Sequence, residues 1–215
     1  MLETKKYVLT VEGETEKWYF LWLKDQINSV ESRTYNASVV PKVQQSPRSF
    51  YKRTNAKATP EIIHICDVES TDRCHIDKFE NILKEMKEAN SQRSIKYTLG
   101  YSNFTFELWI ILHKKDCFGP FTSRKQYLTP IRQCFNENFE DLDHYKQEAT
   151  FKRCLKKLTL DDVKSAIKRA DRLTQQNLND NKAITKQSGY SYYRENPALS
   201  INEVIKRILT ECGVM

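Results

Sequence analysis

Short runs of residues typical of buried strands alternate with helical patterns through the first half of the chain, and this order constrains the fold more than any other feature. Buried strands are predicted at Tyr7 to Val11, Glu61 to Cys66 and Ile95 to Gly100, with a further strand within Ala37 to Val43. Strands that alternate with helices favour a mainly parallel sheet that is covered on both faces, which is an α/β fold.

Three predicted helices separate and follow these strands. Thr15 is expected to cap the first helix, whose apolar face begins at Trp18. Apolar residues at helical spacing predict a second helix from about Ile76 to Ala89. Residues 102–103 are expected to cap a third helix, which ends near His113.

The pattern changes after Pro120 to one that is almost entirely helical. Helices are predicted at about 123–136, 149–157, 161–177 and 200–212, and a basic, aromatic stretch at 182–194 lies between the last two. No linker rich in Pro, Gly or Ser separates the two halves. We therefore expect a core domain over residues 1–120 and a helical extension, residues 121–215, that packs on it.

Composition excludes several classes of protein. Hydrophobic residues make up 39% of the 215 residues, which is enough for a packed core and too much for a disordered chain. The apolar runs are far shorter than the roughly 20 residues that cross a bilayer, and the first residues are charged rather than leader-like. The six cysteines include no pair at the two-residue spacing of zinc or redox motifs. A cytoplasmic protein with free thiols is expected.

Acidic residues gather where the predicted strands end. Glu12 comes directly after the first strand, and Asp67 and Glu69 follow the second. Glu107 lies on the helix after the third strand, and Glu16 lies one helical turn beyond Glu12. The carboxyl ends of parallel strands are where open α/β sheets place their sites. Carboxylates held together repel one another, and a hard divalent cation relieves that repulsion. An all-oxygen cluster suits Mg²⁺ or Mn²⁺ rather than zinc.

Each of these residues also has a purely structural interpretation. Any one acid taken alone is well explained as an exposed turn or cap residue. Asp72 is expected at a helix start, where it either caps the helix or contributes to the metal site. His113 is placed at a helix end, where it either interacts with the helix dipole or donates a proton to a leaving group. His64 lies within a hydrophobic strand and is interpreted as a core residue.

Four segments of the sequence resemble one known family in the expected order. They are residues 11–16 (VEGETE) followed by 18–20 (WYF), residues 67–69 (DVE), residues 102–113 (SNFTFELWIILH) and residues 196–200 (NPALS). The resemblance is to the RloB-like family of the TOPRIM superfamily, and residues 102–113 are its most specific part. Three places depart from the pattern: Glu69 stands where the family usually has Asp, Phe104 where it commonly has Pro, and Ala198-Leu199 near where it commonly has Ser-Thr.

The resemblance implies a TOPRIM-like sheet with a metal-dependent nuclease site. Glu12 would be a metal ligand or general base, and Asp67 and Glu69 would hold Mg²⁺ or Mn²⁺. Glu16 and Glu107 are further catalytic candidates. The implied substrate is RNA, including tRNA, or DNA, and such families are associated with prokaryotic defence against phage, often beside an encoded ATPase. A non-catalytic TOPRIM-like module that binds nucleic acid or a partner is the alternative. The length leaves little room for a topoisomerase or primase, and the sequence leaves the oligomeric state open.

Two basic segments are candidates for binding nucleic acid. Residues 32–60 contain no acidic residue although the net charge of the whole chain is only +7, and residues 182–194 combine basic residues with tyrosines. Basic side chains track phosphates, and tyrosines stack on unpaired bases. The candidate contacts are Arg48, Lys52, Arg53, Lys186, Tyr190, Tyr192 and Arg194. A solvated basic surface with core tyrosines is the simpler interpretation of the same pattern.

Overall fold

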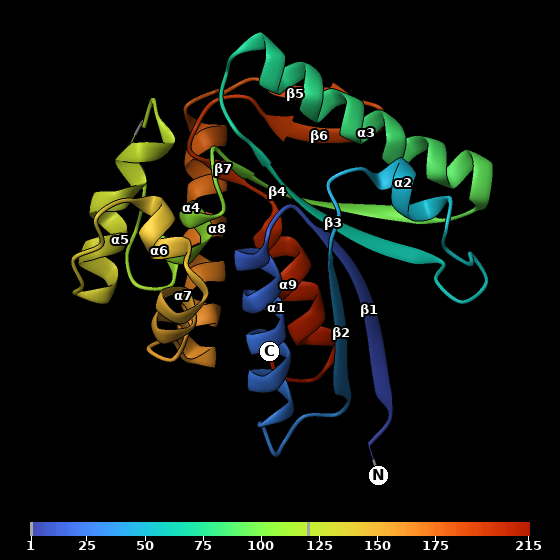
Figure 1. Cartoon of the computed structure of the whole chain (residues 1–215), viewed down its shortest axis with the longest axis horizontal. Coiled ribbons are helices and arrows are strands. Elements are labelled where there is room, and N and C mark those ends of the chain that lie inside the picture. The colour runs from blue at the N-terminus through green and yellow to red at the C-terminus, as the bar shows by residue number, and fades with distance from the viewer. Residues whose placement is uncertain (1, 120) are drawn as a thin grey trace.

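A mostly parallel sheet lies at the centre of the computed structural model, which describes residues 2–119 and 121–215 (Figure 1). Its strand order is β2-β1-β3-β4-β7. The first four strands in this order are parallel, and the short β7 pairs antiparallel with β4. The strands are β1 (Thr4–Val11), β2 (Asn36–Val43), β3 (Glu61–Val68), β4 (Lys96–Asn103) and β7 (Ala198–Leu199). The predicted α/β fold with a mainly parallel sheet is confirmed.

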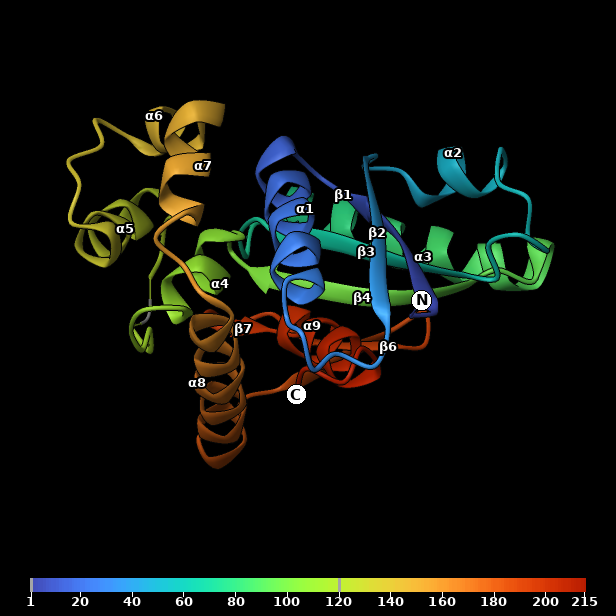
Figure 2. The ribbon, with the colours of Figure 1, turned by 90° about the horizontal axis from the view of Figure 1, so that it is seen from below.

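Helices cover both faces of this sheet. Helices α1 and α9 lie on one face, and α3 lies on the other (Figure 1). Helices α5, α6 and α7 form a group beside α1 at one end of the molecule (Figure 2). The helices are α1 (Glu14–Asn28), α2 (Pro47–Tyr51), α3 (Arg73–Arg93), α4 (Glu107–Leu112), the 3-10 helix η1 (Arg124–Tyr127), α5 (Leu128–Phe135), α6 (Leu142–Lys146), α7 (Glu148–Leu155), α8 (Leu160–Asn179) and α9 (Ile201–Glu211).

The strands alternate their side chains between two hydrophobic clusters. Leu9 and Ile63 face the larger cluster, which contains residues of α1, α4, α8 and α9. Ile62 and Cys66 face the smaller cluster, which lies under α3. The period of two residues along each strand produces this division. Because the larger cluster includes residues from both sides of residue 120, the helical second half packs on the sheet. Met1 and Pro120, the ends of the predicted core domain, lie outside the described residues.

Two predicted helix caps are wrong. The N-cap of α1 is Gly13, and Thr15 lies within the first turn. Residues 102–103 belong to β4 and are paired with Asp67, Val68 and β7, so they do not cap a helix. The third helix begins only at Glu107. In both places polar residues suited to caps serve other roles: the Thr15 hydroxyl donates to Glu16, and residues 102–103 pair within the sheet.

Five short elements were not predicted, one of which is the two-residue strand β7. Helix α2 interrupts the expected basic loop, with Ser46 as its N-cap. Helix α6 lies between the predicted helices of the second half, with Asp141 as its N-cap. The stretch 182–194 forms a hairpin of β5 (Ile184–Gln187) and β6 (Tyr190–Tyr193). Elements of four or five residues carry too little periodicity for pattern analysis. Among the described helices, none is both long and apolar enough to span a membrane.

Candidate functional site

A cavity of about 290 Å³ lies at the carboxyl ends of β1 and β3, and we name it the carboxylate site. The first turn of α1 forms one wall. Side chains from η1 and α6 contribute to the opposite part of the lining. The lining residues are Glu12, Gly13, Glu14, Thr15, Glu16, Gln45, Asp67, Glu69, Arg124 and Lys146. The parallel strands therefore bring together acids that are 55 residues apart in the sequence, as the sequence predicts.

Glu12 and Asp67 are held against each other by the ends of two neighbouring strands. Glu12 Oε2 accepts a hydrogen bond of 3.3 Å from the backbone N–H of Asp67. Burial is the main cause that raises the pKa of Glu12 to about 7, and the charges of Glu16 and Glu69 add to it. Burial and the charge of Glu12 raise the pKa of Asp67 well above its ordinary value. Both side chains therefore favour a proton or a cation nearby.

Glu16 points into the same site from the first turn of α1. Its side chain is only 6% exposed, and Oε2 accepts a hydrogen bond of 3.1 Å from the Thr15 hydroxyl. Burial raises the pKa of Glu16, and the charge of Glu107 raises it further. Gly13 lies so close that a Cβ placed there would be 3.0 Å from Glu16 Oε2. The small residue at the start of α1 therefore leaves room for this carboxylate.

Glu107 does not line the carboxylate site itself, but its partner does. Its side chain is fully buried, and the Thr105 hydroxyl donates a hydrogen bond to Oε2. Oε1 has no hydrogen-bond donor among the described residues. Its charge is instead balanced by an ion pair of 3.2 Å between Oε1 and Lys146 Nζ. A buried carboxylate needs such a partner, and the pairing connects Glu107 to the site through Lys146.

Lys146 is the principal residue that sequence reasoning missed. Burial acts to lower the pKa of Lys146, but the negative charges of Glu107 and Asp67 outweigh it and raise the pKa. Lys146 therefore carries a positive charge within a site that is lined by five acidic residues and one other basic residue, Arg124. The residue ends the five-residue helix α6, and no motif in the sequence distinguishes it from the many exposed lysines. Only the tertiary fold brings it to Glu107, which lies 39 residues earlier.

Glu69 occupies the rim of the carboxylate site and is already paired with basic side chains. Oε1 lies 2.7 Å from Lys78 Nζ, and Oε2 lies 3.6 Å from both His75 Nε2 and Arg124 Nη1. Partial burial acts to raise the pKa of Glu69, but the hydrogen bond from Lys78 and the surrounding positive charges outweigh it and lower the pKa. Of the five predicted acids, Glu12, Glu16, Asp67 and Glu69 line the cavity, and Glu107 reaches it only through Lys146.

His113 and Asp72 have structural surroundings. His113 is buried, with Nε2 3.1 Å from the Tyr19 hydroxyl and Nδ1 3.0 Å from the Trp109 carbonyl oxygen. Burial lowers the pKa of His113 to about 4. Asp72 is the N-cap residue of α3 and accepts a hydrogen bond from Ser70. Neither residue lines the carboxylate site. His64 is buried in β3, in agreement with its interpretation as a core residue.

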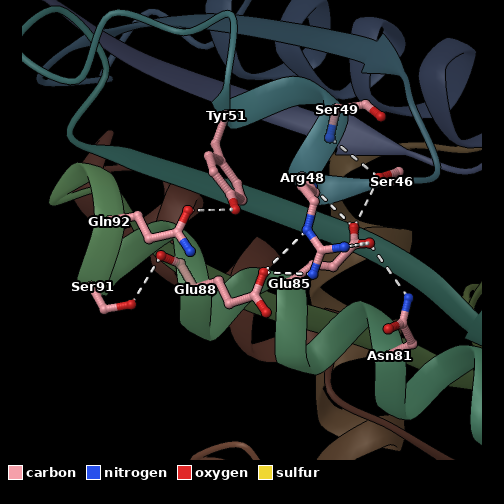
Figure 3. A network of polar contacts seen from close by, with 9 residues as sticks. All are labelled: Ser46, Arg48, Ser49, Tyr51, Asn81, Glu85, Glu88, Ser91 and Gln92. Carbon is pink, nitrogen blue, oxygen red and sulfur yellow. Dashed lines mark hydrogen bonds and ion pairs between the residues drawn. The ribbon is translucent and has the colours of Figure 1, made fainter.

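The basic residues of 32–60 divide into paired and unpaired groups. Arg48 lies in a network that joins α2 to α3, with Nη2 2.6 Å from Glu88 Oε2 and Nη1 3.7 Å from Glu85 Oε1 (Figure 3). This position favours a structural role for Arg48 over the predicted contact with nucleic acid. Lys52 and Arg53 are exposed.

The candidate residues in and just after the hairpin of β5 and β6 also divide into engaged and exposed side chains. Tyr192 is only 1% exposed and packs against Phe79 and Tyr101, so it cannot stack on a base in this arrangement. Arg194 Nη2 lies 2.7 Å from Glu80 Oε1. Tyr190 is half-buried and donates a hydrogen bond to the backbone of β4, whereas Lys186 is exposed. Tyrosines in this stretch serve mainly to close the core under α3.

A comparison with protein-family models places residues 7–208 in one family, which is described as RloB-like protein. The chain belongs to the RloB-like protein family. The match covers both the sheet and the later helices, so α6 and Lys146 fall within it. Comparisons with curated proteins and with solved structures gave no match.

The chemistry of the carboxylate site of this family member suits a hard divalent cation. Within residues 2–119 and 121–215, no group of three or more Asp, Glu, His or Cys side chains is already arranged at metal-ligand spacing. The donor set nevertheless fits: Glu12, Glu16 and Asp67 offer oxygen ligands, and burial raises the pKa of each. Glu107 Oε1 is also buried without a hydrogen-bond donor in the described parts of the chain. Glu12 and Asp67 are the residues that would hold Mg²⁺ or Mn²⁺.

Proposed function

We propose that this chain is a metal-dependent nuclease that hydrolyses phosphodiester bonds at the carboxylate site, in a TOPRIM-like fold. One observation carries the proposal: Glu12, Glu16, Asp67 and Lys146 converge on one cavity, and the pKa of each of these three acids is raised. Strongly shifted acids that share a cleft with a charged lysine are typical of a catalytic site. Membership of the RloB-like family supports the same assignment.

The residues of the carboxylate site would have different roles in hydrolysis. Glu12 would act either as a metal ligand or as the general base, a role for which its metal-free pKa of about 7 suits it near neutral pH. Lys146 and Arg124 direct positive charge into the cavity, where negative charge develops on the phosphate oxygens. Asp67 and Glu12 would hold Mg²⁺ or Mn²⁺, which when bound lowers the pKa of water and neutralises phosphate charge. Glu16 and Glu107 would fix these groups in position.

The substrate and its biological setting follow from the family resemblance and from charge. We propose RNA, including tRNA, or DNA as the polymer, and defence against phage as the setting, with an ATPase encoded nearby as a partner. The net charge of +7 is consistent with a polyanionic substrate, because Lys and Arg release counterions from phosphates.

Cleavage assays with matched variants test the proposal. The purified chain is incubated with single-stranded RNA, tRNA, single-stranded DNA and duplex DNA in Mg²⁺ or Mn²⁺, alone and with the neighbouring ATPase. We expect cleavage of at least one polymer, and loss of at least 100-fold in Glu12→Gln and in Asp67→Asn. Glu31→Gln is the control, because it removes the same charge from an exposed residue that does not line the site.

Two results would contradict the proposal. No cleavage of any polymer under these conditions would leave the non-catalytic binding module as the better explanation. Cleavage that persists undiminished in both Glu12→Gln and Asp67→Asn would come from another site or from a contaminant. Thermal unfolding of each variant verifies that it is folded before its activity is compared with that of the native chain.

A further inference from the structure

A second and larger cleft, of about 440 Å³, lies between the sheet and helix α2, and we name it the α2 cleft. Its floor is formed by side chains such as Lys6 and Val8 of β1 and Lys42 of β2. These positions alternate with Tyr7 and Leu9, which face the larger hydrophobic cluster, so the α2 cleft opens on the α3 side of the sheet. Phe50 and Arg53 line it from α2 and the segment that follows.

The charge of the α2 cleft is entirely positive. Lys6, Lys42 and Arg53 line it, and its lining includes no Asp or Glu. Among the described residues, none of these three cations takes part in an ion pair. Arg48 of α2, by contrast, forms ion pairs with Glu85 and Glu88. Three unpaired cations around one concave surface attract an anion with several charges.

The roof of the α2 cleft is held in place by polar contacts. Glu85 Oε2 accepts hydrogen bonds from the Ser46 hydroxyl at 2.8 Å and from the Arg48 backbone N–H at 3.0 Å (Figure 3). Tyr51 donates a hydrogen bond to Gln92 near the other end of α3. Helix α2 is therefore fixed to α3 along its length, and the cleft beneath it exists before any ligand binds, which lowers the cost of binding.

The α2 cleft and the carboxylate site are lined by consecutive residues of the chain. Gln44 lines the α2 cleft, and the next residue, Gln45, lines the carboxylate site. The backbone N–H of Gln44 also donates a hydrogen bond of 2.8 Å to the carbonyl oxygen of Val11, which directly precedes Glu12. The two sites are therefore neighbours at the end of β2.

Dimensions favour a single strand over a duplex as the ligand. Lys6 pairs in register with Ser38, four residues before Lys42, so the two lysines are about 13 Å apart along the strands. A cleft volume of about 440 Å³ is of the size that holds a small molecule, and it is too small to admit a double helix. Phe50 adds an aromatic ring to the lining, and Lys42 Nζ lies 5.5 Å from its centroid. Cations combined with an aromatic ring are typical of sites for unpaired nucleotides.

We propose that the α2 cleft binds the phosphates of one or two unpaired nucleotides next to the bond that is cleaved at the carboxylate site. The inference rests on the proposed nuclease function and defines its substrate further: a polynucleotide with a single-stranded segment at the cleavage position. Lys6, Lys42 and Arg53 contact phosphates, and the strand continues past Gln44 and Gln45 toward Glu12.

Strand binding measured without cleavage tests this inference. Fluorescence anisotropy is recorded in EDTA with labelled ten-nucleotide oligouridine and oligothymidine, with a ten-base-pair duplex, and with UMP as a competitor. The variants are Lys6→Ala/Lys42→Ala and Arg53→Ala. The control is Lys84→Ala/Lys87→Ala, which removes the same charge from exposed positions of α3 that do not line the cleft.

We expect the dissociation constant for the strand to rise at least tenfold in Lys6→Ala/Lys42→Ala, and the slope of log affinity against log salt to fall by about 1 to 2. The control should differ from the native chain by less than threefold, and the duplex should bind more weakly than the strand. Equal affinities in the cleft variants and the control would overturn the inference. Equal binding of the duplex, or displacement of the strand by UMP as effectively as by unlabelled strand, would also overturn it.

The outcome is separable from that of the proposed function. A native chain that binds the strand through these cations but cleaves no polymer would refute the nuclease and retain the α2 cleft as a strand-binding site. A chain that cleaves nucleic acid with unchanged strand affinity in the cleft variants would refute the cleft alone. Thermal unfolding of the variants excludes misfolding, which is not expected because the substituted side chains are exposed.

Discussion

Lys146 Nζ lies 3.2 Å from Glu107 Oε1, and this contact joins the last residue of α6 to a carboxylate that is fully buried under the candidate site. The lysine side chain remains 27% exposed and lines the cavity, so one end of the ion pair is accessible to a ligand. A buried carboxylate without a partner is unfavourable. The pair therefore couples the stability of the fold to the presence of a positive charge in the site.

Removal of Lys146 should destabilise the protein and abolish cleavage. We expect Lys146→Met to lower the free energy of unfolding by about 3 kcal/mol, because Glu107 is left buried and unpaired. The double variant Lys146→Met/Glu107→Gln should regain most of that stability and remain inactive, since the neutral amide needs no counter-charge. Urea unfolding at pH 7.5 measures the free energy of unfolding of both variants. Equal destabilisation of the single and double variants would mean that the pair contributes little to folding.

The raised pKa of Glu12 predicts a pH-dependent stability in the metal-free protein. With a pKa of 4.5 when unfolded and about 7 when folded, the folded state holds an extra proton between these values. Its stabilising effect is present below pH 4.5 and is lost as the pH rises through 7. The variant Glu12→Gln cannot titrate at this position, so it does not lose stability there as the pH rises. Its free energy of unfolding relative to the native chain should therefore increase by up to about 3 kcal/mol between pH 4.5 and pH 8.

Comparison with the variant is essential for that measurement. Burial lowers the pKa of His64 and of His113 to about 4, which destabilises the fold as the pH falls below 6.5 and so opposes the contribution of Glu12. Both histidines are present in the native chain and in Glu12→Gln, so their contributions cancel in the difference. Denaturant unfolding in EDTA at several pH values provides the data. A difference that does not change with pH would contradict the raised pKa.

The sequence predicts most of the sheet because each long strand is a hydrophobic run that is bounded by turn residues. The same reasoning places Glu12 and Asp67 at one edge, since parallel strands end together, and the structure brings them into contact. Ser102 fails as a predicted cap because its pairing with Asp67 in β3 is a contact between distant segments. Local patterns cannot report such contacts.

The sequence does not predict Lys146 as a site residue, again because its contact joins segments that are distant in the chain. Lys146 lies on a helix of five residues, and its partner Glu107 lies on α4, so the two meet only in the folded protein. The basic run 32–60 was correctly recognised as free of acids, yet Arg48 is neutralised by Glu88 of α3. Charge that is counted along the chain does not predict which cations stay unpaired after folding.

Binding of a divalent cation is predicted to depend on pH and on Asp67. Because burial raises the pKa of Glu12 to about 7 and that of Asp67 above its ordinary value, a cation must displace protons at neutral pH. Titration calorimetry with Mn²⁺ should give an affinity that increases from pH 6 to pH 8, with protons released to the buffer. Asp67→Asn should weaken binding at least tenfold, whereas Glu31→Gln should not. Binding without proton release would contradict this prediction.

Gly13→Ala tests whether the position of the Glu16 carboxylate matters for catalysis. The backbone of Gly13 is extended, with φ of −142° and ψ of −179°, so alanine fits there without strain. Its Cβ would lie 3.0 Å from Glu16 Oε2 and would displace that oxygen by a few tenths of an ångström. Stability should change by less than about 1 kcal/mol, as for a weaker helix N-cap. Cleavage should fall about tenfold or more, since small misplacements of catalytic groups are costly.

Gly119→Ala is the matched control for Gly13→Ala, because the nearest atom to a Cβ at that position is 3.7 Å away on the Phe121 ring and need not move. Thermal unfolding and initial cleavage rates are compared for the two variants and the native chain. If Gly13→Ala unfolds at the native temperature and cleaves at the native rate, Glu16 tolerates displacement and acts only as a structural acid at the start of α1. If the rate falls while the unfolding temperature is retained, the effect arises in the carboxylate site, because Gly13 contacts Glu16 there and the fold is intact.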